Sequence, residues 1–182
     1  MALPTRIFLT GFMGSGKSTI GPILANVLGY AFVDLDQAIA EQARRPVQRI
    51  FAEEGEAAFR QLEREALRET GQREPIVVAV GGGALTFEEN LQWALANGII
   101  VYLYVSLDDL VGRLLHGRTV RPLLLDERGE VMPEEDLREK VAGMMARREP
   151  FYRQAHLTVE TGNLRVGHAV DAVARAVRRY GG

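Results

Sequence analysis

Short runs of large and β-branched apolar residues alternate along the chain with stretches in which apolar residues recur every three or four positions. The first pattern is typical of buried strands and the second of helices that pack one face on a core. The predicted strands are residues 7–10, 31–33, 76–80, 99–105 and 157–160. The predicted helices are residues 17–28, 37–43, 47–52, 56–69, 86–97, 106–115 and 167–179, and a further helix ends at 147–152.

Strands that alternate with helices predict an α/β fold with a parallel sheet and helical crossovers. A length of 182 residues is typical of one domain, so we expect a single domain over 1–182. Local signals support several helix ends. Gly29 stands at a C-cap position, Thr86 begins a stretch with capping-box spacing, and Ser106 stands at an N-cap position.

The segment 117–133 departs from the regular pattern because glycines and prolines interrupt it and four charged residues lie between 126 and 130. A loop of this length in a compact domain is usually either a functional lid or disordered. We predict that it is a lid.

The composition excludes several classes of function. The chain has no cysteine, which excludes disulfides, thiolate metal sites and cysteine nucleophiles, and which is consistent with a cytoplasmic location. A net charge of −2 argues against broad attraction to nucleic acid or to an anionic membrane. Only Lys17 and Lys140 are lysines among 22 basic residues, so a lysine at a functional position needs its own reason.

A glycine-rich segment, Gly11–Ser18, matches G-x-x-x-x-G-K-[ST] and lies between a predicted strand and a predicted helix. Such a loop points backbone N–H groups at phosphates, and the helix N-terminus adds partial positive charge. We expect Lys17 to reach the β- and γ-phosphates and the Ser18 hydroxyl to ligate Mg²⁺. The predicted nucleotide-binding residues of this loop are Gly14, Ser15, Gly16, Lys17, Ser18 and Thr19.

The surroundings of this loop favour a small-molecule kinase over a motor or a GTPase. The strand 76–80 ends in glycines and offers no carboxylate, so Asp34, at the end of 31–33, is the better candidate for the metal. The guanine-recognition sequence Asn-Lys-x-Asp is absent, and the chain is too short for a long motor insertion.

Further polar residues have both a catalytic and an ordinary interpretation. Asp36 follows Asp34 at the C-terminal end of a strand, where ligands bind in open α/β sheets, but it is also a suitable helix N-cap. Arg60, taken alone, is better explained as an ion-pair partner of Glu56 on a solvated helix face. The glycines at 81–83 allow close approach of a small molecule, or form a plain turn.

Taken together, these residues resemble the shikimate kinase family over about 7–152. The resemblance is carried by the segments 11–21, 32–36, 55–63, 81–83 and 121–124. It implies a nucleoside-monophosphate-kinase-like fold, with a five-stranded parallel sheet in the order 2-3-1-4-5 and helices on both faces. It also implies a mobile substrate-binding region at about 37–64, the lid, and phosphorylation of the shikimate 3-hydroxyl by ATP with Mg²⁺.

The resemblance also implies roles for individual residues. Asp34 would serve the metal, Asp36 the acceptor hydroxyl, and Arg121 both the nucleotide and the transferring phosphate. Arg60 and Arg148 would bind the shikimate carboxylate, Gly82 and Gly83 would lie against the ring, and Glu63 would support an arginine. Arg113 and residues 161–165 are weaker matches on the adenine side. Pro22, Ala40 and the segment Arg44–Pro46 depart from the family pattern.

Three alternatives remain open at this stage. One is gluconate kinase or another small P-loop kinase, because gluconate is also a carboxylate. The second is a non-catalytic regulatory module that binds nucleotides, although Lys17, Ser18, Asp34, Asp36 and Arg121 are all present. The third, nucleic-acid binding through the arginines, is weak because acidic residues are interleaved with them. We expect a monomer whose partners are ATP and shikimate, with no nucleic acid and no membrane.

Overall fold

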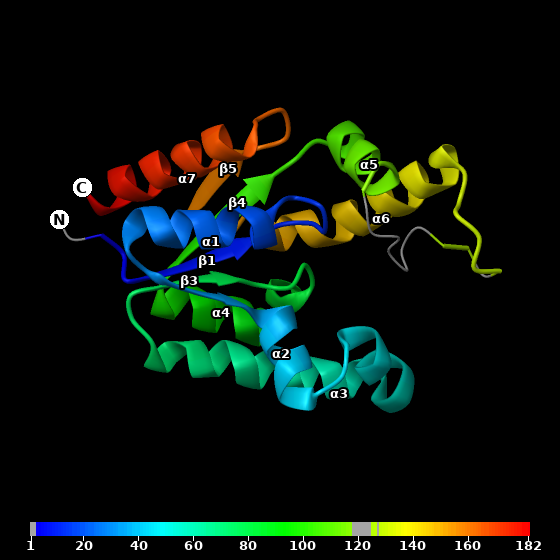
Figure 1. Ribbon diagram of the computed structural model, residues 1–182, viewed down its shortest axis with the longest axis horizontal. Coiled ribbons are helices and arrows are strands. Elements are labelled where there is room, and N and C mark those ends of the chain that lie inside the picture. The colour runs from blue at the N-terminus through cyan, green and yellow to red at the C-terminus, as the bar shows by residue number, and fades with distance from the viewer. Residues whose placement is uncertain (1–2, 118–124, 127) are drawn as a thin grey trace.

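The computed structural model describes residues 3–117, 125–126 and 128–182 (Figure 1). Five strands form one parallel sheet in the order β2-β3-β1-β4-β5, which confirms the predicted fold class and strand order. The strands are β1 (Arg6–Thr10), β2 (Ala31–Asp34), β3 (Ile76–Ala79), β4 (Ile99–Tyr104) and β5 (Leu157–Glu160).

Helices cover both faces of the sheet. They are α1 (Lys17–Leu28), α2 (Leu35–Ala43), α3 (Val47–Glu69), α4 (Glu88–Asn97), α5 (Leu107–Leu115), α6 (Glu134–Tyr152) and α7 (Val166–Gly181), with short 3₁₀ turns η1 (Thr70–Gln72) and η2 (Ala84–Thr86). Helices α1 and α7 lie on one face and α3 and α4 on the other, while α5 and α6 extend past the C-terminal ends of the strands (Figure 1). No helix in the described ranges carries an apolar stretch long enough for a bilayer span.

Alternate side chains of the central strands β1, β3 and β4 pack into two separate cores, one on each face of the sheet. On β1, Ile7 and Leu9 pack with α1 and α7, whereas Phe8 packs on the opposite face with residues of α3 and α4. Side chains of a strand alternate between the two faces of a sheet, so a strand covered on both faces needs apolar residues at every position. The continuous apolar runs in the sequence reflect this double coverage.

Two of the predicted helix ends are confirmed. Gly29 ends α1 with φ 73°, a left-handed conformation that glycine adopts without steric cost. The Ser106 side chain caps α5 by accepting a hydrogen bond from the Asp109 amide, at 3.2 Å. The structure also extends the first strand by one residue, to Arg6, although arginine carries no apolar signal.

The capping box predicted at Thr86 is wrong. Helix α4 begins at Glu88, and the Thr86 hydroxyl instead donates to the carbonyl oxygen of Gly83, at 2.7 Å. Thr86 belongs to η2, so its side chain satisfies that turn. The two helices predicted at 47–52 and 56–69 are the halves of α3, which Gly55 interrupts with φ 84° and ψ 174°.

Arg6 is buried and joins the start of β1 to the segment 70–74, which precedes β3, and to the end of α4. Its guanidinium donates to the carbonyl oxygens of Thr70 (3.1 Å), Asn97 (2.6 Å) and Gly71 (2.9 Å), and to the Glu74 carboxylate (2.8 Å). We expect Arg6→Met to lower the free energy of unfolding by about 2–4 kcal/mol, because these carbonyl groups lose their donor inside the protein.

Urea denaturation measures this loss. Arg153→Met is the matched control, since Arg153, the residue that follows α6, is largely exposed and forms an ion pair with Glu149 at the end of that helix. The control should change stability by less than about 1 kcal/mol. Equal effects of the two substitutions would contradict the importance of the Arg6 hydrogen bonds.

Candidate functional site

A cleft of about 530 Å³ lies where β1, β2 and β3 end. The loop after β1, the start of α2 after β2 and the glycines after β3 meet there because parallel strands end at the same edge of a sheet. The structure brings most of the predicted residues into this cleft. Its walls include Gly14, Gly16, Lys17, Ser18, Thr19, Asp36, Arg60, Gly82, Gly83 and Arg148.

The glycine-rich loop, residues 11–18, curls around the N-terminus of α1. Gly14 and Gly16 have φ values of 83° and 99°, which L side chains rarely adopt. No side chain of the described residues caps the start of α1, so its first backbone N–H groups can bind an anion. The Lys17 ammonium donates to the carbonyl oxygens of Gly11 (2.7 Å) and Phe12 (3.1 Å) of the loop.

Asp34 connects this loop to α2. One of its carboxylate oxygens accepts a hydrogen bond from the Ser18 hydroxyl, at 2.6 Å. The other accepts from the backbone amides of Asp36 (3.1 Å) and Gln37 (3.4 Å), so Asp34 is the N-cap of α2. The alternative interpretation of Asp36 as the helix cap is therefore wrong. A hydroxyl and a carboxylate side by side are oxygen donors of the kind that Mg²⁺ prefers.

Asp36 lies in the first turn of α2 and faces the cleft. Burial raises the pKa of its carboxyl group, and the negative charge of Asp34 raises it further, while Lys17 and Arg60 act in the opposite direction. A carboxylate with a raised pKa holds a proton more strongly than an ordinary aspartate does. The environment therefore favours hydrogen bonding to an acceptor hydroxyl.

Arg60 is held in place by two carboxylates of α3. Its guanidinium binds Glu63 at 2.8 Å and Glu56 at 3.1 Å. The Glu63 side chain is only 1% exposed, and burial raises the pKa of its carboxyl group, which the charge of Arg60 opposes. The predicted pair with Glu56 exists, but Arg60 does not lie on a solvated face, because its side chain is 18% exposed and borders the cleft.

Three aromatic rings surround the same guanidinium. Its central carbon lies 5.4 Å from the ring centre of Phe59, 6.0 Å from that of Phe51 and 5.2 Å from that of Phe87. Such contacts stabilise a cation and limit its movement. No role was predicted for these phenylalanines. Phe51 and Phe59 stand out only as aromatic residues within the mostly polar helix α3, and Phe87 comes from a different element, the N-cap of α4.

Arg64, one turn along α3, has a different environment. It pairs with Glu89 of α4 at 3.5 Å. Its side chain is 44% exposed. Arg60 and Arg64 of the same helix thus have different environments, because different elements of the fold lie opposite them.

Each glycine of the triplet 81–83 lies against a charged side chain. A Cβ atom on Gly81 would lie 2.9 Å from carboxylate oxygens of Asp36 and Glu63. One on Gly82 would lie 3.5 Å from a nitrogen of Arg148, and one on Gly83 would lie 2.9 Å from a nitrogen of Arg60. The interpretation as a plain turn is incomplete, because the small size of these residues, at 81 and 83 above all, lets the charged groups approach the backbone.

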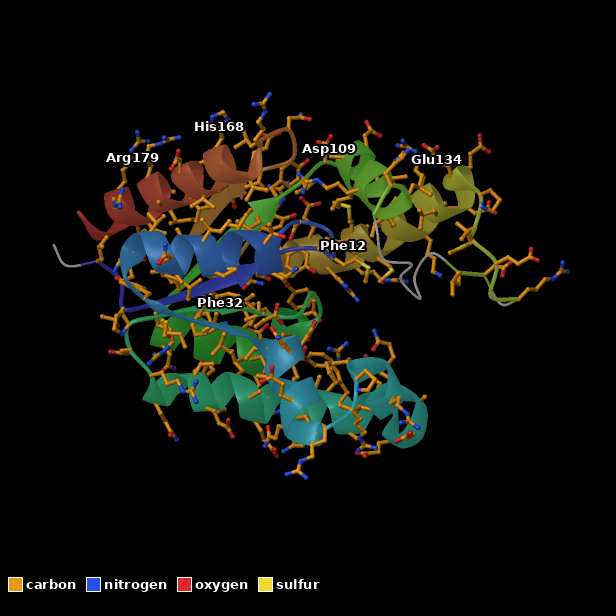
Figure 2. The ribbon with its side chains drawn as sticks, in the orientation of Figure 1. Phe12, Phe32, Asp109, Glu134, His168 and Arg179 are labelled. Carbon is orange, nitrogen blue, oxygen red and sulfur yellow. The ribbon has the colours of Figure 1, made fainter. Side chains whose placement is uncertain are left out.

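Arg148 reaches the cleft from α6. Its guanidinium lies over the ring of Phe12, at 5.6 Å from the ring centre. Phe12 belongs to the loop between β1 and α1, and its buried ring packs with residues of α6 (Figure 2). The arginine is therefore placed between the phosphate-binding loop and the glycine triplet.

A second cavity, of about 300 Å³, adjoins the phosphate-binding loop. Arg113 of α5 lines this cavity, and its guanidinium donates to the carbonyl oxygens of Gly14 (3.0 Å), Thr161 (3.1 Å) and Gly162 (2.6 Å). Its lining also includes Ser15, Ile20, Leu164, Val166 and Ala169. Of the predicted residues Arg113 and 161–165, Arg113, Thr161 and Leu164 line this cavity. Ile20, Val166 and Ala169 were not predicted, because their proximity depends on the packing of α1 against α7.

Arg121 lies outside the described residues, as does most of the first half of the predicted lid. In the described part of 117–133, Leu125 and Val131 form an isolated antiparallel bridge. The Asp126 amide donates to the Glu130 carbonyl oxygen at 2.8 Å within this turn.

Comparison with known proteins agrees with this site. The shikimate kinase family profile matches residues 13–178. A shikimate kinase from Chlorobium luteolum is 49% identical over 173 residues, which cover 95% of this chain and 85% of the relative. One from Chlorobium phaeobacteroides (strain BS1) is 46% identical over 180 residues, 99% of this chain and 90% of the relative.

Solved structures give the same result. The structure of a shikimate kinase from Bacteroides thetaiotaomicron has a TM-score of 0.88 and 34% identity, and covers 96% of this chain and 99% of its own. One from Acinetobacter baumannii in complex with shikimate has a TM-score of 0.81 and 35% identity, covering 97% and 92%. A gluconokinase from Sinorhizobium meliloti shares the fold, with a TM-score of 0.66 at 22% identity and coverage of 99% and 95%. The chain therefore belongs to the shikimate kinase family.

Proposed function

We infer that this chain transfers the γ-phosphoryl group of ATP to the 3-hydroxyl of shikimate. The observation that carries this inference is a single cleft that joins a phosphate-binding loop, an aspartate whose carboxyl pKa is raised and two arginines. Phosphoryl transfer depends mainly on positioning and on neutralisation of charge, and the cleft supplies groups for both.

On the nucleotide side, residues 14–19 bind the phosphates and Lys17 approaches the β- and γ-phosphates. The second cavity, beside Arg113, receives the adenine. Ser18 and Asp34 hold Mg²⁺, which neutralises phosphate charge when it is bound. Their oxygen atoms fit this ion, as the 2.6 Å contact between them places two hard donors together. Arg121 binds the nucleotide and stabilises the transferring phosphoryl group.

On the acceptor side, Asp36 orients the hydroxyl and takes its proton. Arg60 and Arg148 bind the carboxylate, since a guanidinium matches a carboxylate through two parallel hydrogen bonds. Gly82 and Gly83 lie against the ring. Glu63 and the three phenylalanines hold Arg60 in its position for this contact.

The test is ADP formation by the purified protein with Mg·ATP and shikimate, gluconate or no acceptor. Shikimate should accelerate ADP formation strongly, and gluconate should not. Equal rates with both acceptors, or no stimulation by either, would overturn the assignment. Identities of 46–49% to shikimate kinases support shikimate over gluconate as the acceptor.

The sequence also led us to propose a cytoplasmic monomer that binds neither nucleic acid nor membranes. Light scattering on the purified protein tests the monomer. A mass twice that of the 20.1 kDa chain would contradict it.

The arginine contact allows a matched comparison within one helix. We expect Arg60→Ala to weaken shikimate binding by about 1.5–3 kcal/mol, the scale of a hydrogen bond to a charged group. Arg64→Ala, which removes an exposed arginine of the same helix, should leave shikimate affinity unchanged. Calorimetric titration measures both. An unchanged shikimate Kd in a folded Arg60→Ala protein would assign this residue a purely structural role.

A further inference from the structure

Tyr152, the last residue of α6, carries a buried hydroxyl at the edge of the cleft. The residue is 2% exposed, and its ring packs against Tyr102 of β4 with ring centres 5.1 Å apart. Its hydroxyl donates a hydrogen bond to the carbonyl oxygen of Gly82. A buried tyrosine on one helix is thus bonded to the backbone of the glycine triplet, which lies 70 residues away in the sequence.

Arg148 approaches the same hydroxyl from one turn earlier in α6 and hydrogen-bonds it. Its guanidinium also lies close to Gly82, since a Cβ atom there would be 3.5 Å from the arginine nitrogen. The Tyr152 oxygen accepts from Arg148 while its proton goes to Gly82. One hydroxyl therefore joins the arginine to the glycine triplet, the two groups that flank the acceptor side of the cleft.

This arrangement persists over the working pH range. Burial raises the pKa of Tyr152 to about 12, and the charge and hydrogen bond of Arg148 oppose that rise only in part. The phenol keeps its proton near neutral pH and remains a donor to the Gly82 carbonyl group. A phenylalanine at this position would fill the same space without either hydrogen bond.

We propose that Tyr152 is a positioning residue for the acceptor, whose hydroxyl sets the spacing between the Arg148 guanidinium and the backbone of Gly82. The arginine has a second constraint, because its guanidinium also packs over the ring of Phe12. Without the hydroxyl, Arg148 can rotate away from the triplet, and ordering it again costs binding free energy. This inference rests on the proposed function, in which Arg148 and Gly82 contact shikimate.

The test is steady-state kinetics of Tyr152→Phe. We expect the KM for shikimate to rise roughly tenfold, the scale of one hydrogen bond to a charged group, while the KM for ATP stays within about twofold. The fold-decrease in kcat should be smaller than the fold-increase in the KM for shikimate. Tyr102→Phe is the matched control, because it removes a hydroxyl from the adjacent buried ring, and it should leave the KM for shikimate unchanged.

A purely structural role predicts a different result, namely lower thermal stability and similar changes in both KM values. A double-mutant cycle separates the two roles. In an Arg148→Ala background, Tyr152→Phe should change the KM for shikimate by less than about twofold, because the arginine that it orients is absent. Additive effects of the two substitutions, or an unchanged KM for shikimate in Tyr152→Phe, overturn the inference.

A second measurement uses a substitution that retains both the Tyr152 hydroxyl and the fold. With 3-fluorotyrosine in place of Tyr152, the ¹⁹F resonance should shift on saturation with shikimate, and a resonance unmoved by shikimate counts against the inference.

Turnover of shikimate by the wild-type protein distinguishes failure of the proposed function from failure of the role of Tyr152. No turnover of shikimate by the wild type overturns the proposed function together with this inference, whereas normal turnover with an unaffected Tyr152→Phe variant overturns this inference alone.

Discussion

Asp36→Asn is expected to lower kcat by about 10²–10⁴-fold, the range for loss of a general base. Asparagine has nearly the same shape, so the fold and nucleotide binding should be retained. Calorimetry with ATP and single-turnover kinetics with shikimate measure the two quantities separately. Loss of ATP binding in this variant would show that Asp36 serves the nucleotide and that its assignment to the acceptor is wrong.

The pH dependence gives an independent measurement of the same group. Asp36 must be ionised to accept a proton, and its pKa is raised by burial and by Asp34. Activity should therefore fall, as the pH decreases, at a higher pH than for an ordinary aspartate. Asp34→Asn removes the adjacent negative charge and should move this acid limb to lower pH, besides increasing the Mg²⁺ requirement. An acid limb unaffected by Asp34→Asn would exclude this coupling.

Lys17→Met is expected to lower kcat/KM for ATP by about 10²–10³-fold, the scale for one electrostatic contact to the developing charge. Lys17→Arg should restore little, because a planar guanidinium is larger than an ammonium and fits poorly where two loop carbonyl oxygens lie within 3.1 Å of the lysine nitrogen. This result would explain why lysine is kept here in a chain whose other basic residues are almost all arginine.

The control uses the only other lysine of the chain, Lys140, which lies on the exposed surface of α6. Lys140→Met should keep near-normal kcat and KM. If Lys17→Arg is as active as the wild type, then the positive charge alone is sufficient and the argument from side-chain shape fails.

Much of the fold was predictable because its signals are local. The apolar runs of the strands, the C-cap at Gly29 and the N-cap at Ser106 depend on residues within a few positions of one another. The phosphate-binding loop is equally local, since its glycines, lysine and serine follow one another directly in the chain. For these features, neighbouring residues determine the backbone conformation and the chemistry together.

Local sequence patterns gave wrong predictions where a side chain could form either of two hydrogen-bonding arrangements. Thr86 had the spacing of a capping box, yet its hydroxyl is taken by η2. Asp36 was a possible cap of α2, but Asp34 caps this helix and also accepts a hydrogen bond from Ser18, which leaves Asp36 to face the cleft. Arg44, in the segment that departs from the family pattern, ends α2 with φ 53°, a backbone conformation unusual for arginine.

The sequence by itself determined the α/β fold, the strand order through resemblance, and the nucleotide loop. The local residue pattern did not distinguish Arg60 from Arg64, and only the resemblance named Arg60. Tertiary structure gives the physical reason, because Gly83 and Phe87 lie against Arg60 whereas Glu89 pairs with Arg64. It also decided that Tyr152 bonds Gly82 across 70 residues. Helical periodicity places residues on a face, but which element covers that face depends on chain topology, which local residue patterns do not encode.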